Sequence, residues 1–247
     1  MLDGVAASIR SEEGEPLNRL LAVLPDSELL KLQPDLQAVR LAPGHVLFDA
    51  DQPAERVYFP DSGVASLAAT FENRVTRGVA TVGREGVVGA APLLLGGATT
   101  IGRSRVLVPG SARTVEVSAF QRALGSSSKF RAACEAYTRA LLVQILQAVP
   151  CSRLHTVEQR CARWLLMCAD RADDDKVELT CEGLAEMLGV PPSRFEVVTR
   201  KMEKAGLICG RPGVITMLNR PGLEAATCGC YWILNKHDGY STPPKSP

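Results

Sequence analysis

The sequence of 247 residues has no apolar run that approaches the ~18 residues needed to span a membrane. Its first residues, MLDGVAASIRSEEGEPL, lack the basic start and the apolar block of a secretory signal peptide. These two absences lead us to expect a cytoplasmic protein with no membrane partner. Neither sign of charge is in large excess, since the net charge is +1, so any surface for nucleic acid has to be local.

Motifs of common enzyme classes are also missing. The chain has no G-x-x-x-x-G-K-[ST] phosphate loop, no H-E-x-x-H zinc motif and no nucleophile elbow. GREGVVGAAPLLLGG is rich in glycine, but it lies between expected strands instead of opening a helix. We therefore predict that the protein is not an enzyme.

No cysteine precedes Cys134, and all eight cysteines lie in the second half of the chain. In a cytoplasmic protein of this length, such cysteines are more often buried thiols than disulfides. Cys151 and His155 could ligate a metal only if two more ligands joined them. Cys228 and Cys230 could form a redox pair or a soft-metal site, but their spacing lacks the pairing typical of zinc sites. We therefore predict no metal site and no cofactor.

The order of elements indicates an α+β protein. Two short helices, within PLNRLLAVLP and DSELLKLQP (the second capped by Asp26 or Ser27), precede β-rich pieces that run from Leu36 to Val117 with Gly, Pro and Asp turns between them. Such spacing favours an antiparallel barrel or roll. Helical periodicity follows over 118–124 and 128–149, and we expect Pro150 to end or kink the second of these helices.

The helix expected at 128–149 has apolar side chains on two adjacent faces. One stripe consists of Phe130, Cys134, Tyr137, Leu141, Ile145 and Ala148, and the other of Leu142, Leu146 and Val149. A helix of this kind packs against two bodies, and one of them is the roll. The other is either the same helix of a second chain or the interior of the same domain, and periodicity leaves both open.

The stretch LTCEGLAEMLGVPPSRFEVVTRKMEKAGLI, residues 179–208, predicts two helices joined by a tight turn. Thr180 is the expected cap of the first helix, Gly189 makes the turn, and Pro191-Pro192 open the second, where the first-turn N–H groups need no partner. The apolar side of the second helix consists of Phe195, Val198, Met202 and Ala205. Its opposite side and flanks carry Ser193, Arg194, Glu196, Val197, Arg200, Lys201 and Lys204.

Charge is divided between the two helices. Residues 189–220 hold six basic residues against two acids, a net +4, whereas 170–188 hold two against seven, a net −5. LICGRPGVITML then reads as a hairpin with Arg211 at its tip. A basic helix after a tight turn, followed by a basic hairpin, is typical of a winged helix-turn-helix that binds DNA. An ordinary helical hairpin with a solvated basic face remains the alternative.

Residues 179–208 resemble, without gaps, the helix-turn-helix signature of the Crp/Fnr family of bacterial transcription regulators. The resemblance extends upstream through PG-x-VLF, VYFPDSGVASL and VGREGVVGA to the helix at 128–149. It implies a roll of the cyclic-nucleotide-binding type, a dimerisation helix and a winged helix on a near-palindromic DNA site. The partners implied are double-stranded DNA, a second copy of the chain, RNA polymerase and an unknown small-molecule effector.

The resemblance also assigns residues and boundaries. The implied divisions are a flexible tail (1–15), a β-roll sensor domain (16–127), a dimerisation helix and hinge (128–155), a winged helix-turn-helix domain (156–235) and a second tail (236–247). The implied dimer interface consists of Phe130, Cys134, Tyr137, Leu141 and Ile145. The implied DNA contacts are Thr180, Ser193, Arg194, Glu196, Val197, Arg200, Lys201, Lys204 and Arg211.

Two departures from the family pattern change what is expected of the ligands. The effector pocket would comprise Gly86, Gly89, Ala90, Arg103, Ser104 and Ile145. Ala90 stands where nucleotide-binding members have the ribose carboxylate, and apolar Ile145 and Leu146 replace base contacts, so we predict that cyclic AMP is not the effector. Pro192, Ser193 and Val197 occupy the base-reading positions, so the operator differs from familiar ones. A module whose helix-turn-helix no longer binds DNA is the alternative function.

Overall fold

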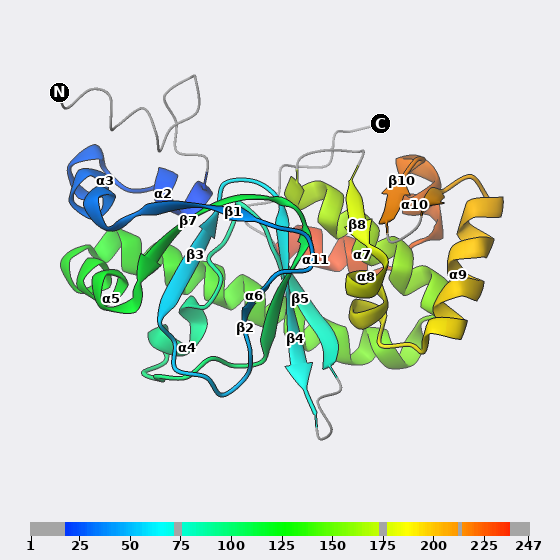
Figure 1. Cartoon of the computed structure of the whole chain (residues 1–247), viewed down its shortest axis with the longest axis horizontal. Helices are drawn as coiled ribbons and strands as arrows, with labels where there is room; N and C mark the ends of the chain where they lie inside the picture. Colours follow the sequence, from blue (N-terminus) through cyan, green and yellow to red (C-terminus); the bar gives the residue numbers. More distant parts are fainter. Residues whose placement is uncertain (1–17, 72–75, 173–176, 212–213, 238–247) are drawn as a thin grey trace.

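The computed structural model describes residues 18–71, 76–172, 177–211 and 214–237 (Figure 1). The helices are α2 (Arg19–Ala22), α3 (Asp26–Leu32), the 3-10 turn η1 (Gln33–Asp35), α4 (Ala90–Leu94), α5 (Val117–Ser126), α6 (Ser128–Leu154), α7 (Val157–Ala172), α8 (Cys181–Leu188), α9 (Pro192–Lys204), α10 (Arg220–Ala226) and α11 (Cys230–His237). The strands are β1 (Gln37–Leu41), β2 (Val46–Phe48), β3 (Arg56–Pro60), β4 (Val64–Thr70), β5 (Thr76–Val82), β6 (Arg103–Val108), β7 (Gly110–Glu116), β8 (Glu178–Thr180), β9 (Ile208–Arg211) and β10 (Val214–Met217).

Some sequence-based expectations fall outside these ranges. The tail expected at 1–15 lies outside the described residues, and so does the Pro212-Gly213 pair of the expected hairpin. Of the tail expected at 236–247, Lys236 and His237 belong to α11, and the rest lies outside the described residues. None of the helices in the described ranges has the length and apolar composition required to cross a bilayer.

The N-terminal half is an antiparallel roll made of two sheets. One has the strand order β1-β7-β3 and the other the order β2-β6-β4-β5, and every pairing in them is antiparallel. Turns such as that at Gly63, whose φ is +77°, connect the strands where the chain reverses direction. The antiparallel roll predicted from the alternation of β-rich pieces and turns is therefore confirmed.

An aromatic cluster fixes α5 and α6 to the roll. Phe59 of β3, Phe120 of α5 and Phe130 of α6 are fully buried, with ring centroids 5.7 to 6.2 Å apart. Pairs of rings at this spacing add stabilisation beyond that of the buried area. Because the cluster joins two helices to one strand, the roll and the first turns of α6 form one core.

The long helix does not end at Pro150. It runs from Ser128 to Leu154 with Pro150 inside it, so of the two effects expected of Pro150, an end or a kink, the end is excluded. A proline removes one helical N–H donor, but the last turn still closes, since the His155 N–H donates to the Cys151 carbonyl at 3.3 Å. The extension places Cys151 on the helix and His155 at its C-cap.

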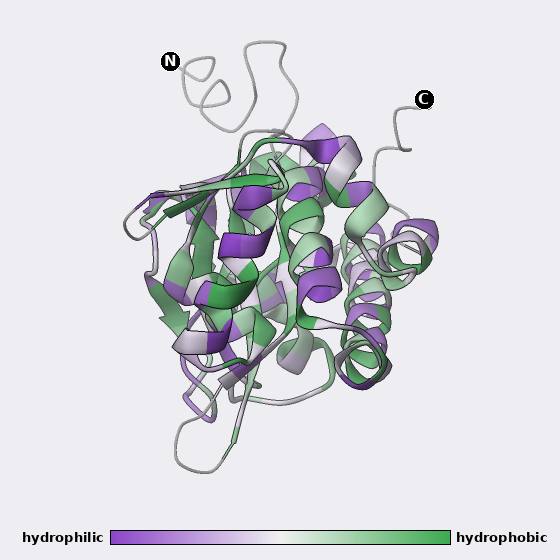
Figure 2. Ribbon diagram, turned by 90° about the vertical axis from the view of Figure 1, so that its right-hand side faces the viewer, coloured by the Kyte–Doolittle hydropathy of each residue, from purple (hydrophilic) through white to green (hydrophobic). Residues whose placement is uncertain are grey.

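The C-terminal half is built around α7, which is buried along most of its length. A three-stranded sheet of order β8-β10-β9 and the helices α8 to α11 surround α7 (Figure 1). In the view of Figure 2, the helices of this half show green and purple segments along the same ribbon, as amphipathic helices do. Two short helices, α10 and α11, follow the three-stranded sheet, and residues 227–229 separate them.

One further cap differs from expectation. Neither Asp26 nor Ser27 caps α3; Pro25 occupies the N-cap position, without a side-chain hydrogen bond, and its carbonyl accepts from the Leu29 N–H.

The two halves of the chain pack directly against each other. Helix α8 lies on β5, where Gly78 approaches Met187 so closely that a β-carbon at Gly78 would overlap it. The Arg171 guanidinium of α7 forms a buried ion pair with Glu85, at 2.9 Å, and donates to the Thr81 carbonyl of β5. The position of the helix-turn-helix is thus defined by contacts with the roll of the same chain.

Candidate functional site

The helix-turn-helix has the local structure that its sequence predicts. The Thr180 hydroxyl accepts the Gly183 N–H at 3.1 Å and caps α8. Gly189 ends this helix in the left-handed conformation, with φ +64° and ψ 42°, which glycine adopts without steric cost. Pro191 precedes α9 and Pro192 is its first residue. The two helices therefore meet at the tight turn expected at Gly189.

Helix α9 presents one buried and one exposed side. Phe195, Val198 and Met202 are buried in the core of the C-terminal half, as predicted, whereas Ala205 is exposed at the C-cap. The remaining side chains of interest are all exposed: Ser193, Arg194, Glu196, Val197, Arg200, Lys201 and Lys204. Figure 1 places α9 at the outer edge of the molecule, so this surface is open to a partner.

Val197 is the apolar centre of the exposed face of α9, with 51% of its surface accessible. A valine at this exposure is poorly placed for stability, because its apolar surface stays in water. It can instead contact a thymine methyl group when the helix lies in a major groove.

Ion pairs divide the basic residues of α9 into two groups. Arg200 lies 3.3 Å from Glu196 one turn earlier, and Lys201 lies 2.9 Å from Glu158 of α7. Within the described part of the chain, Arg194 and Lys204 have no ion-pair partner. Exposed pairs of this kind contribute little to stability, so a phosphate can displace either carboxylate at small cost. The Lys201 contact lowers the pKa of Glu158, mainly through its hydrogen bond to that carboxylate.

The hairpin after α9 supplies a second basic element. Strands β9 and β10 pair antiparallel, with Val214 opposite Arg211. Strand β10 also pairs with β8, the strand that immediately precedes α8 in the chain. The Gly210 N–H donates to Glu203 at 2.7 Å, which fixes the hairpin to the end of α9. Arg211, the last residue of β9, is exposed.

The apolar stripe assigned to the dimer interface lies inside the chain. Phe130, Cys134, Tyr137 and Leu141 are buried in the core of the roll, and Ile145 packs against that core. The four buried side chains leave almost no surface for a second chain, which conflicts with their assignment to the dimer interface, whereas Ile145 is only half-buried and remains a candidate for it.

The exposed apolar face of α6 is the neighbouring stripe. Leu142, Leu146 and Val149 are 53%, 61% and 66% exposed. These three side chains lie at i, i+4 and i+7, which is one continuous strip along the helix.

The residues of the expected effector pocket are close-packed. A β-carbon at Gly86 would overlap the ring of Tyr137 on α6, and Ala90, the first residue of α4, is buried. Ser104 is also buried, and its hydroxyl has no hydrogen-bond partner within the described residues. Ile145 packs at the edge of the same core.

Two consecutive residues at the end of β2, Phe48 and Asp49, lie near two residues of the expected pocket, Gly89 and Arg103. A β-carbon at Gly89, the N-cap of α4, would lie 3.5 Å from the ring of Phe48, and the carboxylate of Asp49 lies 3.1 Å from Nε of Arg103. The guanidinium expected to hold a phosphate thus already has an anionic partner.

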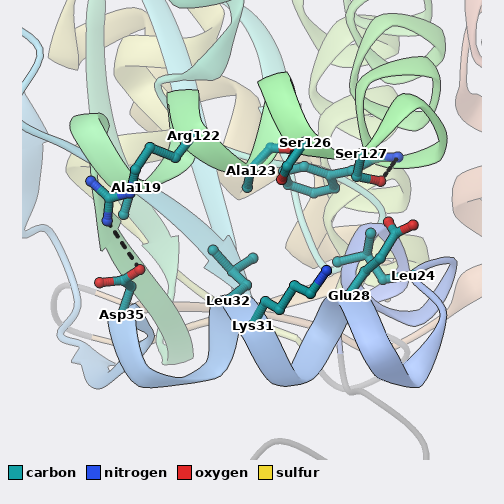
Figure 3. A pocket seen from close by; sticks show the side chains of 11 residues that line it. Leu24, Glu28, Lys31, Leu32, Asp35, Ala119, Arg122, Ala123, Ser126 and Ser127 are labelled. Carbon is teal, nitrogen blue, oxygen red and sulfur yellow. Dashed lines mark hydrogen bonds and ion pairs between the residues drawn. The ribbon is translucent and has the colours of Figure 1, made fainter.

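A cavity of about 240 Å³ lies away from these residues, between α3 and α5 (Figure 3). Its floor is apolar, with Leu24, Leu32 and Phe130, and its rim carries the ion pair of Arg122 with Asp35 at 3.3 Å. None of the residues expected to bind an effector lines this cavity.

A cluster of cysteines is the site that sequence reasoning missed. Cys151, His155, Cys228 and Cys230 bring three sulfur atoms and a ring nitrogen within 4.8 Å of one another. The sequence shows Cys151 close to His155 and Cys228 close to Cys230. It does not show that the two pairs meet, because this depends on contact between the end of α6 and the start of α11.

Comparison with known proteins identifies the C-terminal half. A family model for the Crp-like helix-turn-helix domain matches residues 159–226. The HTH-type transcriptional regulator Cmr of Mycobacterium tuberculosis is 28% identical over 212 residues, which cover 83% of this chain and 82% of that protein.

Solved structures share the whole architecture. The c-di-GMP-responsive regulator CLP of Xanthomonas campestris superposes with a TM-score of 0.62 at 16% identity, covering 79% of this chain and all of that one. FixK2 of Bradyrhizobium japonicum does so with a TM-score of 0.63 at 19% identity, covering 78% and 98%. At these identities the likeness concerns the fold: an N-terminal roll followed by a C-terminal helix-turn-helix.

Proposed function

Because the chain is a transcription regulator of the Crp/Fnr family, we propose that it binds a near-palindromic DNA operator as a homodimer, with α9 in the major groove. Regulators of this family are not enzymes. In this proposal residues 16–127 form the sensor domain, 128–155 the dimerisation helix and hinge, and 156–235 the DNA-binding domain.

The observation that carries the proposal is the exposed face of α9. Its inner side is anchored by Phe195, Val198 and Met202, so the helix is rigidly held while its outer side remains free. Arg200 can form two hydrogen bonds with a guanine edge, and Val197 can contact a thymine methyl. Arg194, Lys204 and Arg211 flank this face and are suited to phosphates, whose neutralisation supplies most of the affinity.

The dimer would form through the exposed stripe of α6. Leu142, Leu146 and Val149 provide a continuous apolar strip, and a second copy of α6 is complementary to it by two-fold symmetry. A two-fold axis through α6 gives two copies of α9, which read half-sites about one helical turn, ~34 Å, apart.

Cyclic AMP is not the effector in this proposal. Ala90 offers no carboxylate for a ribose, and Arg103 is paired with Asp49. A different small molecule, or a change at another site of the chain, would control the regulator.

Selection of binding sites from a random double-stranded DNA library tests the function. The wild-type protein is expected to enrich an inverted repeat, and the double variant Arg200→Glu with Lys204→Glu is expected to enrich nothing. Lys31→Glu with Lys129→Glu makes the same charge change at exposed positions away from α9 and should select the wild-type site. A wild-type protein that shows no salt-dependent DNA binding would favour the alternative of an interaction module.

A further inference from the structure

Four side chains that can bind a soft metal converge beside the end of α6. Cys151 lies in its last turns and His155 is its C-cap, while Cys228 lies between α10 and α11 and Cys230 is the first residue of α11. Helix α11 contacts both α6 and α7 in this region. The three cysteines are buried and form a small cluster separate from the main cores, whereas His155 is half-buried at its edge.

Two distances within the cluster match edges of a tetrahedron around a metal, and all four ligand atoms lie within 4.8 Å of one another. The sulfur atoms of Cys151 and Cys228 are 3.7 Å apart, and the Cys230 sulfur lies 3.6 Å from Nδ1 of His155. Zinc binds cysteine sulfur at about 2.3 Å and histidine nitrogen at about 2.0 Å in tetrahedral sites. Those bond lengths place two sulfurs about 3.8 Å apart, and a sulfur and a nitrogen about 3.5 Å apart.

A buried cation next to the cluster requires a negative charge. Arg163 of α7 is 2% exposed, and among the described residues its Nε has no hydrogen-bond partner and no carboxylate pairs with its guanidinium. It stacks 4.0 Å over the ring of Trp164, and thiolate charge on Cys151, Cys228 or Cys230 would favour its charged form. A buried charge without a partner is costly. Three thiolates, one neutral imidazole and Zn²⁺ together carry one negative charge, which would balance Arg163.

The surroundings of the cluster supply the hydrogen bond that metal-bound thiolates usually receive. The side-chain amide of Gln147, one turn before Cys151 on α6, donates to the Cys230 sulfur at 3.1 Å. Outer donors of this kind orient the ligands of a metal site and tune its affinity.

We propose that Cys151, His155, Cys228 and Cys230 bind one Zn²⁺ ion in a closed tetrahedral site. Thiolate and imidazole ligands together favour zinc, and four protein ligands leave no open position for catalysis. The ion would tie α11 to the end of α6, beside the connection from α6 to α7 that joins the two halves of the chain. It would therefore stabilise the orientation of the DNA-binding half relative to the dimerisation helix.

Metal analysis of the intact wild-type protein is the direct test. After purification under reducing conditions without chelators, elemental analysis should find one zinc ion per chain. The zinc-free protein should bind one Co²⁺ and show the visible bands of a tetrahedral site together with thiolate-to-cobalt charge transfer. Zinc-free wild-type protein that gives neither cobalt signal, or that contains a Cys151–Cys228 disulfide by mass spectrometry, overturns the proposal.

Matched variants assign the ligands. Cys228→Ser and His155→Asn should each lose the zinc, or retain it with a large loss of affinity, and Gln147→Leu should lower the affinity for Co²⁺ about 10- to 100-fold. Cys161→Ser removes an equally buried thiol outside the cluster, and Cys209→Ser a half-buried one, and both should keep one zinc per chain. His155 is half-buried and therefore tolerates replacement better than the buried Cys228. If Cys228→Ser does not fold, the zinc content of His155→Asn tests the site. Full zinc content in His155→Asn and Cys228→Ser alike would refute the site.

Discussion

The guanidinium of Arg105, on β6 of the roll, lies 2.7 Å from the carboxylate of Glu182 on α8. The contact joins the first helix of the helix-turn-helix to the sensor half of the same chain. A second carboxylate, that of Glu186, lies 3.5 Å from the same arginine. The Arg105 and Glu186 side chains are each only 11% exposed, whereas that of Glu182 is 78% exposed.

These exposures predict unequal effects of two substitutions. Glu182→Ala removes a solvated partner and should lower the free energy of unfolding by less than ~1 kcal/mol. Arg105→Ala leaves the Glu186 carboxylate buried without its cation and should cost about 3–5 kcal/mol. Denaturant unfolding of the two variants checks this difference. Equal losses would show that Glu186 gains another partner or water.

The exposed stripe of α6 predicts how the dimer can be broken. Leu142→Lys with Leu146→Lys should give a folded monomer, because these side chains lie on the surface and lysine stays solvated there. Leu141→Lys should instead unfold the roll, since it buries a charge in the core. Light scattering and circular dichroism separate the two outcomes. Leu30→Lys, at an exposed leucine of α3, serves as the control and should remain dimeric.

Arg200 and Arg211 should affect DNA binding in different ways. Arg200 points out from the face of α9, so Arg200→Ala should relax the base preference at one position per half-site, by ~1–3 kcal/mol of discrimination. Arg211 lies on the hairpin, where it is suited to a phosphate. Arg211→Ala should weaken binding to all sequences alike and reduce the salt slope by about one.

A randomised site library bound to both variants at several salt concentrations measures these effects. If Arg211→Ala altered the base preference while Arg200→Ala only scaled the affinity, the helix would lie in the groove differently from the arrangement proposed here.

Cyclic AMP and cyclic GMP should not bind at micromolar concentrations. The main obstacle is the missing ribose carboxylate at Ala90, whereas the Asp49 carboxylate that pairs with Arg103 is 57% exposed and adds only a small cost. Losing a buried charged partner typically costs ~2–5 kcal/mol. Isothermal titration should show no saturable heat at low micromolar nucleotide. Asp49→Ala offers a matched comparison, and tight binding by the wild type would contradict the account of Ala90.

The local elements could be predicted because their signals are local. Thr180, Gly189 and Pro192 define the two helices of the helix-turn-helix by capping and by backbone preference, and the structure confirms all three. The alternation of β-rich pieces and turns likewise predicted the antiparallel roll.

The assignment of faces on α6 could not be obtained in the same way. Periodicity shows that a helix has two apolar faces, but it does not show which of them meets the roll. Phe130 decides the matter in the structure, since it packs with Phe59 and Phe120 from other elements. The face that carries Leu146 is therefore the one left exposed.

Two further features could not be predicted from the sequence: the position at which α6 ends and the meeting of cysteines that lie far apart in the chain. Pro150 disfavours a helix by removing one donor, yet α6 continues to Leu154, and Cys151 in its last turns packs with Cys228 and Cys230. The motifs typical of zinc sites have paired ligands that lie close together in sequence, and Cys228 and Cys230 lack that pairing. Here the partners lie 75 to 77 positions away, a separation that sequence spacing alone does not reveal.

This separation also sets an order of events during synthesis. The roll and most of α6 leave the ribosome before Cys228 is added to the chain. Synthesis of the 77 residues from Cys151 to Cys228 takes about 4–15 s at typical elongation rates of ~5–20 residues per second. During that interval Cys151 and His155 have no contact with Cys228 or Cys230. The packing at the end of α6 therefore becomes complete only after α11 has been synthesised.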